Sequence, residues 1–337
     1  MSDARRWPAE WEPHAATIVT WPWDASIWKN AHEGAMDALA KAAALLSHGE
    51  RVIVLAPSEA WVPAVTGRVS AAGGEMTNIE IALIPSNDFW ARDHAPTFVR
   101  SATGLVGIDW NFNAWGGKFP HDRDARIAAA VCDLLALDTP CVRERATLTL
   151  EGGALETNGQ GTVLCTRSVC FTDTRNPIRE EATATEELKK RLGADKIVWL
   201  DAGMSCDDTD GHIDTLARFV DPNTIAVHVT DDPDHPDAAT LEANALTLAS
   251  LGDILRLPAP TIRDERGELL PASYANFYVA NSVVLVPAYG HPSLDEQARA
   301  TLADAFSGRD VHAIDCRALL TQGGAIHCAT QQVPATR

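Results

Sequence analysis

Acidic residues and a histidine recur at matching places in the chain, each about eight to ten residues before the centre of a predicted hairpin turn. Asp93 and Glu151 precede the first two turns, and His212 and Asp214 precede the third. Near the end of the sequence, Cys328 follows a pair of glycines. If the repeated units surround an axis, loops at matching places point to one centre. The spacing therefore predicts that three carboxylates, an imidazole and a thiol converge on one site.

Carboxylates around a single thiol restrict the chemistry of such a site. The sequence has neither the CxxC nor the HExxH spacing of zinc sites. The acidic segment 207–214 does not fit a calcium loop, because Cys206 and Ala217 would occupy the first and twelfth positions. We therefore expect no metal. A cysteine protease would not place so many carboxylates around its thiol.

The same carboxylates indicate what the site binds. Negative charge raises the pKa of a thiol and disfavours the thiolate, unless a cation is present. Guanidinium is planar, permanently charged and bound by carboxylates through paired hydrogen bonds. The residues therefore predict a cationic guanidine substrate that lowers the pKa of Cys328 when it binds.

Hairpins and helices alternate along the chain with a common period. The predicted strand pairs are 97–100 with 105–109, 154–157 with 162–166, 216–220 with 224–229 and 276–280 with 283–286. Their turn centres are 57, 62 and 59 residues apart, and the helices that follow them repeat at 57, 59 and 55 residues. Two features that share one period indicate a structural repeat.

Hairpins between helices distinguish this chain from a doubly wound parallel sheet, in which single strands alternate with helices. The pattern predicts an α/β fold of about five ββαβ modules around an axis, a propeller, with a first module near residues 15–75. No linker rich in proline, serine or glycine divides the sequence. We therefore expect a single domain over residues 1–337.

Composition excludes several classes of protein. Lysine and arginine number 28 against 46 acidic residues, a net charge of −18, which argues against a nucleic-acid partner. No apolar run approaches the ~20 residues that cross a membrane, and residues 1–12 do not read as a secretory signal. Seven irregularly spaced cysteines argue against a disulfide framework and favour the cytoplasm. Five of ten tryptophans lie in the first 28 residues, and we expect core packing, with an assembly such as a homodimer if some are exposed.

Seven ordered segments resemble the motif series of the agmatine deiminase family. This family belongs to the guanidine-modifying superfamily, with peptidylarginine and arginine deiminases. The segments are 7–14, 87–93, 109–117, 150–153, 207–214, 273–278 and 323–332. The resemblance extends nearly from end to end and implies a five-module α/β propeller.

The resemblance also implies roles for the residues that converge. Cys328 matches the nucleophile and His212 the general acid and base, while Asp93 and Asp214 match the carboxylates that grip the guanidinium and Glu151 a supporting acid. The implied reaction passes through a covalent thiouronium on the cysteine and needs no metal or organic cofactor. With agmatine as substrate, the products are N-carbamoylputrescine and ammonia, a step of polyamine biosynthesis that leads to putrescine.

The far end of the substrate is where alternatives remain open. Trp90 and Asp208 match residues near the tail. A substrate with a carboxylate, such as arginine or a peptide arginine, would need a cation in the cavity, for which Arg92 and Lys118 are the candidates. The acidic excess favours an amine tail. A non-catalytic polyamine-binding protein is a third interpretation, but binding alone would not require Cys328 beside a histidine.

Overall fold

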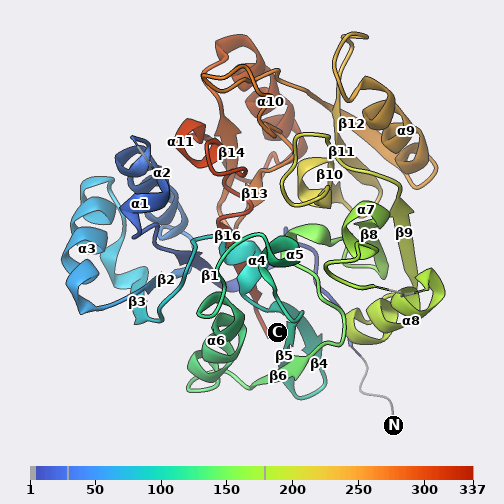
Figure 1. Ribbon diagram of the computed structural model, residues 1–337. Coiled ribbons are helices and arrows are strands. Elements are labelled where there is room, and N and C mark those ends of the chain that lie inside the picture. Colours follow the sequence, from blue (N-terminus) through green and yellow to red (C-terminus); the bar gives the residue numbers. More distant parts are fainter. Residues whose placement is uncertain (1–4, 29, 178–179, 337) are drawn as a thin grey trace.

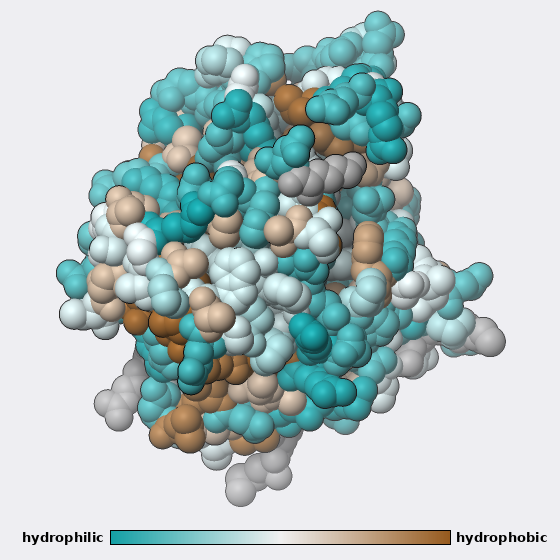
Figure 2. Space-filling view, turned by 60° about the vertical axis from the view of Figure 1, so that its left-hand side comes forward, coloured by the Kyte–Doolittle hydropathy of each residue, from teal (hydrophilic) through white to brown (hydrophobic). Residues whose placement is uncertain are grey.

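Five small sheets surround a common axis in the computed structural model, with the longer helices on the outside of the ring (Figure 1). The structure describes residues 5–28, 30–177 and 180–336. Figure 2 shows a largely hydrophilic face, in keeping with the acidic composition. Within these ranges, no helix is both long enough and apolar enough to pass through a bilayer.

Four of the sheets repeat one pattern, in which two strands form an antiparallel hairpin and a third strand pairs with the second in parallel. Their strands are β4 (Thr97–Ser101), β5 (Gly104–Asp109) and β6 (Cys141–Arg145); β7 (Glu156–Thr157), β8 (Thr162–Thr166) and β9 (Lys196–Leu200); β10 (Ala217–Asp221), β11 (Thr224–Val229) and β12 (Asp253–Pro258); and β13 (Tyr278–Val279), β14 (Val283–Ala288) and β15 (Asp310–Asp315). All four predicted hairpins are confirmed, with ends that differ by one or two residues.

A helix connects the second and third strands of each of these sheets. These helices are α6 (Ile127–Leu135), α8 (Glu181–Leu192), α9 (Ala238–Ala249) and α10 (Pro292–Ala305). In α8, Ala184, Leu188 and Leu192 recur every four residues and are buried, as expected for one face of a helix. The helix ends at Gly193, whose φ of 65° is the left-handed conformation that glycine adopts most easily.

The first sheet differs from its prediction. It contains β1 (His14–Thr20), β2 (Arg51–Ala56) and β3 (Ile79–Leu83), with α2 (His32–Leu46) and α3 (Val62–Ala71) between them. The antiparallel partner of β1 is β16 (Thr330–Pro334), from the far end of the chain. The module at residues 15–75 is therefore not self-contained, because pairing of β1 with β16 closes the ring.

Short helical turns stand before three of the hairpins and meet near the axis. These are α4 (Ala91–His94), a 3₁₀ turn at Gly152–Ala154 and a 3₁₀ turn at Ile213–Thr215. The first turn contacts the second, and the second contacts the third. The remaining short α-helices are α1 (Ala25–Trp28), α5 (Ala114–Gly117), α7 (Arg167–Cys170) and α11 (Arg317–Leu320), and further 3₁₀ turns lie at Glu59–Trp61, Met76–Asn78 and Asp124–Arg126.

The tryptophans near the N-terminus are part of this packing. Trp7, Trp21 and Trp28 are buried, and Trp11 and Trp23 are half-buried. They do not form an exposed apolar face, so the homodimer stays a prediction without support from these residues.

Candidate active site

A cavity of about 180 Å³ lies beside α4. Its lining includes Cys328, Asp93, Trp90 and Asp208. The other three predicted site residues, Glu151, His212 and Asp214, are each 0% exposed. The full lining consists of Ile27, Asp88, Trp90, Asp93, Trp115, Phe119, Asp208, Thr209, Gln322, Gly323, Gly324 and Cys328.

The Cys328 thiol lies between the carboxylate of Asp214 and the side-chain amide of Asn276. Its thiol donates to Asp214 Oδ2 at 3.4 Å and receives a hydrogen bond from Asn276 Nδ2 at 3.1 Å. Asn276 Oδ1 accepts from the backbone N–H of Cys328 at 3.3 Å. Burial raises the pKa of the thiol well above its usual value, and the charges of Asp214 and Asp93 raise it further. A cation bound to these carboxylates would reverse the second effect.

Asp93 is held by two donors and lies beside His212. Gly153 N donates to Asp93 Oδ1 at 3.0 Å, and Trp115 Nε1 donates to Oδ2 at 2.9 Å. Burial raises the pKa of Asp93 to about 6, against the opposing charge of His212. Gly153 must be glycine, because a Cβ there would lie 2.6 Å from His212 Nδ1 and 2.8 Å from Asp93 Oδ1.

His212 is held from its other side by Glu151. Its Nε2 lies 3.2 Å from Glu151 Oε2, and its Nδ1 lies 3.8 Å from Asp93 Oδ1. Against the effect of burial, Asp93 and Glu151 raise the pKa of His212 to about 9. His212 Nδ1 has no hydrogen-bond partner among the described residues. A protonated ring would therefore carry an unpaired N–H at this buried position.

Arg175 connects Glu151 to the acidic loop. Its Nε donates to Glu151 Oε1 at 2.9 Å, and its Nη1 donates to Asp210 Oδ2 at 2.5 Å. Asp207 Oδ2 accepts from His212 N at 3.1 Å. Asp207 and Asp210 therefore shape the loop that carries His212.

A strained loop supplies the indole that holds Asp93. Asn111, Ala114 and Trp115 have φ values of 60°, 54° and 56°, in the left-handed region that side chains other than glycine rarely adopt. Such conformations cost roughly 1–3 kcal/mol each and persist where the surroundings impose them. Sequence reasoning missed Trp115, although it lies within the segment 109–117.

Two further acids line the cavity. Asp88 is half-buried and Asp208 is exposed, and we assign them to the end that would receive the substrate's tail. Phe89 N donates to Asp88 Oδ1 at 2.8 Å, and burial together with the charge of Asp93 raises the pKa of Asp88 to about 6. Asp88 was missed in the sequence. Trp90 lines the cavity and packs on Gly324, where a Cβ would lie 2.7 Å from its ring.

The two candidate cations do not face this cavity as free charges. Lys118 Nζ donates to Asp210 Oδ1 at 2.8 Å and to the carbonyl of Asp208 at 2.5 Å. Arg92 is buried and donates to Glu10 Oε2 at 3.0 Å and to Gln332 Oε1 at 2.7 Å. No lysine or arginine appears in the cavity lining among the described residues.

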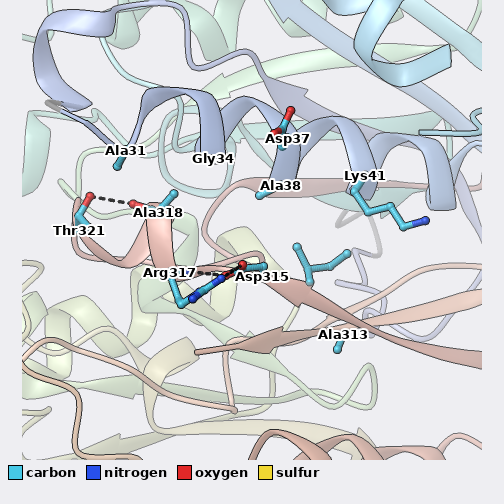
Figure 3. A pocket seen from close by; sticks show the side chains of 11 residues that line it. Ala31, Gly34, Asp37, Ala38, Lys41, Ala313, Asp315, Arg317, Ala318 and Thr321 are labelled. Atoms are coloured by element: carbon cyan, nitrogen blue, oxygen red, sulfur yellow. Dashed lines mark hydrogen bonds and ion pairs between the residues drawn. The ribbon is translucent and has the colours of Figure 1, made fainter. Parts of the chain in front are cut away.

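Two other hollows lie nearby. One of about 820 Å³ shares Asp208, Gln322 and Gly323 with the small cavity, so it adjoins the tail end. The other, about 510 Å³, is a groove beside α2 and α11 that contains Lys41 and Arg317 but no thiol or histidine among its described lining residues (Figure 3). Within the described parts of the chain, no group of three or more histidine, cysteine or acidic side chains is arranged to hold a metal ion.

The family profile of Porphyromonas-type peptidyl-arginine deiminases matches residues 6–334. The chain belongs to this family. A protein of Latilactobacillus sakei, provisionally named agmatine deiminase, is 33% identical over 99% of this chain and 97% of its own length. Two solved agmatine deiminases share the fold. A substrate-bound variant from C. jejuni with cysteine replaced by serine has a TM-score of 0.89, is 27% identical and covers 98% of this chain and 96% of its own.

The second solved structure, the Enterococcus faecalis agmatine deiminase catalysing its reaction, has a TM-score of 0.90 at 26% identity, with 99% of this chain and 97% of that chain covered. These likenesses confirm the resemblance and the fold that it implied. They do not test the role of any single residue, so the roles of the deiminase site residues stay predictions that rest on the geometry.

Proposed function

We propose that this family member hydrolyses agmatine to N-carbamoylputrescine and ammonia. The observation that carries the proposal is the placement of Cys328 and Asp93 in one cavity that Asp88 and Asp208 also line. Several acids in one cavity suit a substrate that carries two cationic groups. The likeness to agmatine deiminases supports the same activity.

The first half of the reaction joins sulfur to the guanidinium carbon. Asp93 and Asp214 bind the guanidinium, and this positive charge lowers the pKa of the thiol so that the thiolate forms. The Cys328 sulfur attacks the carbon, giving a tetrahedral adduct. His212, protonated at neutral pH, gives a proton to the departing nitrogen, and ammonia leaves a thiouronium on the sulfur.

The second half of the reaction releases the Cys328 sulfur from the substrate carbon. His212, now neutral, takes a proton from a water molecule that attacks the thiouronium carbon. The C–S bond breaks, the hydroxyl proton of the adduct passes to the departing sulfur to restore the Cys328 thiol, and the carbon keeps the oxygen as a neutral ureido group. Glu151 and Asp93 stabilise the imidazolium on either side of the ring.

The amine tail is favoured over a carboxylate tail. Arginine would place its carboxylate near Asp88 and Asp208 and would need a cation to bind it. Lys118 is engaged by Asp210, and Arg92 is buried away from the cavity. We infer a cytoplasmic location as well, because all seven cysteines are unpaired thiols, which suits a reducing compartment.

A substrate comparison tests the proposal. We would incubate the protein with agmatine, arginine, guanidinobutyrate and a short arginine peptide, each at saturation, and measure ammonia release. We expect turnover of agmatine well above the other three. Faster turnover of arginine would show that agmatine is not the preferred substrate, but it would leave the proposed mechanism unchanged. Absence of turnover with all four would favour a non-catalytic polyamine-binding protein.

A further inference from the structure

His327, next to the nucleophile, lies between two carboxylates. Its Nδ1 is 2.7 Å from Asp214 Oδ2, and its Nε2 is 3.0 Å from Glu10 Oε2. The ring is 1% exposed. The same Asp214 oxygen accepts from the Cys328 thiol, so contacts run from the sulfur through Asp214 and His327 to Glu10.

These two contacts require two protons. A neutral imidazole donates from one nitrogen only, so its other nitrogen would set a lone pair against an ionised carboxylate. The second proton must therefore sit on the ring or on one of the two acids. Against the effect of burial, Arg218 and His327 hold the pKa of Glu10 well below its usual value, and His327 lowers that of Asp214.

Burial and nearby cations oppose a charged ring. Burial lowers the pKa of His327, Arg218 and Arg92 lower it further, and Glu10 and Asp214 raise it by less, so the pKa lies below its usual value. The ring of Tyr278 lies 6.5 Å away, centroid to centroid. What favours a second proton on the ring is the geometry, because Nδ1 lies 2.7 Å and Nε2 lies 3.0 Å from a carboxylate oxygen.

Glu10 is itself fixed by several parts of the ring. It accepts from Arg92 and from Val279 N at 2.8 Å, and it forms an ion pair of 2.8 Å with Arg218. These partners come from the second, fourth and fifth sheets or the turns before them. The Glu10 carboxylate that contacts His327 is thus held by three partners, and His327 connects it to Asp214.

We propose that His327 is a positioning residue, an imidazolium clamped between Glu10 and Asp214 that occupies Asp214 Oδ2 and leaves Oδ1 for the guanidinium. Asp214 Oδ1 is buried and has no hydrogen-bond partner among the described residues, as this role requires. The inference rests on the proposed function, because it assigns the free oxygen to that substrate. Nothing in it changes the covalent steps.

Histidine ring NMR tests the protonation state without any turnover. In protein labelled with ¹⁵N-histidine at pH 7, we expect the His327 ring to carry hydrogens on both nitrogens. His228, buried and hydrogen-bonded to Ser273 Oγ at 3.1 Å, is the matched control and should carry one. The signal is assigned by its loss in His327→Gln, or in His327→Asn if the first variant does not fold. A singly protonated His327 would overturn the proposal.

Alkylation of Cys328 tests the positioning. We would compare inactivation by 2-chloroacetamidine, a cationic amidine, with labelling of Cys328 by iodoacetamide, a neutral reagent, read by peptide mass spectrometry. A charge-assisted hydrogen bond corresponds to about tenfold or more. We therefore expect His327→Gln to slow the cationic reagent about tenfold and the neutral one by less than about threefold.

The controls separate the possible failures. His228→Gln should leave both alkylation rates within about twofold of the wild type. Equal slowing of both reagents in His327→Gln would indicate a general disturbance of the site and would overturn the positioning role, as would no slowing of either. A wild type that turns over no guanidine would instead reject the proposed function, while the NMR result would stand.

Discussion

The two ends of the catalytic cavity are built differently. At the guanidinium end, Asp93, Glu151 and His212 are buried, and each contacts a residue of another module. At the tail end, Asp208 is exposed and Phe119 is 49% exposed. The buried end rests on turns that repeat around the ring, whereas Asp208 lies at the exposed start of the loop that carries His212, and Phe119 lies in a loop that occurs once. We infer that the fold determines the chemistry and that the loops determine which guanidine is accepted.

The largest expected effect comes from removing the sulfur. Cys328→Ala eliminates the nucleophile but leaves the carboxylates, so we expect kcat to fall more than about 10⁴-fold. Agmatine binding, measured by calorimetry, should persist. Cys316→Ala is the matched control, since this buried cysteine lies away from the cavity and should retain activity. Turnover by Cys328→Ala would remove the sulfur from the mechanism.

The second-largest effect is expected from removing the charge of Asp93, which binds the guanidinium. Asp93→Asn leaves the cation and His212 without a carboxylate, and breaking such a buried pair costs about 3–5 kcal/mol. We expect kcat/KM for agmatine to fall by about two to three orders of magnitude. Asp122→Asn, an exposed change, serves as the control. Activity near the wild-type level in Asp93→Asn would show that the guanidinium is held elsewhere.

The pH dependence of kcat/KM should depend on the two titratable groups at the buried end, Asp93 and His212. Asp93 has a pKa of about 6 and must be ionised to bind the cation, so kcat/KM should fall about tenfold per unit as pH drops below 6. His212 has a pKa of about 9 and must be protonated to act as the acid, so activity should also decline above pH 9. A profile of kcat/KM against pH measures both limbs. A flat profile between pH 5 and 8 would contradict the assignment of Asp93.

The smallest effects belong to the open end. Asp208→Asn removes an exposed charge, for which about 0.2–1 kcal/mol is typical. We expect KM for agmatine to rise a few-fold, and the same variant should leave KM for butylguanidine, which lacks the amine, unchanged. Asp88→Asn should show a larger rise in the same direction, because Asp88 is more buried. Equal effects on both substrates would place these acids away from the amine.

Sequence reasoning located the repeated part of the site and missed the rest for a physical reason. Asp93, Glu151 and Asp214 could be predicted because equivalent turns meet at the axis of a ring. Trp115 and Arg175 could not, because their contacts depend on loops whose conformations no local pattern specifies; the left-handed backbone at Trp115 is one example.

The fold likewise divides into a part that local sequence patterns predict and a part that they do not. The four hairpins and the helices after them follow from local periodicity and turn residues, and they are confirmed. The partner of β1 could not be predicted, because nothing near residues 14–20 indicates a strand that lies more than three hundred residues away. The role of His327 was missed for a similar reason, since Glu10 reaches it from the opposite end of the sequence.

Closure of the ring by β16 sets the order in which the site can form during translation. The acids at Asp93, Glu151 and Asp214 leave the ribosome first, and Cys328 follows only as the strand that pairs with β1 is made. At about 5–20 residues per second, the nascent chain spends many seconds with its anionic groups complete and its sulfur not yet synthesised. A prematurely terminated product therefore has neither the reactive thiol nor the strand that locks the ring.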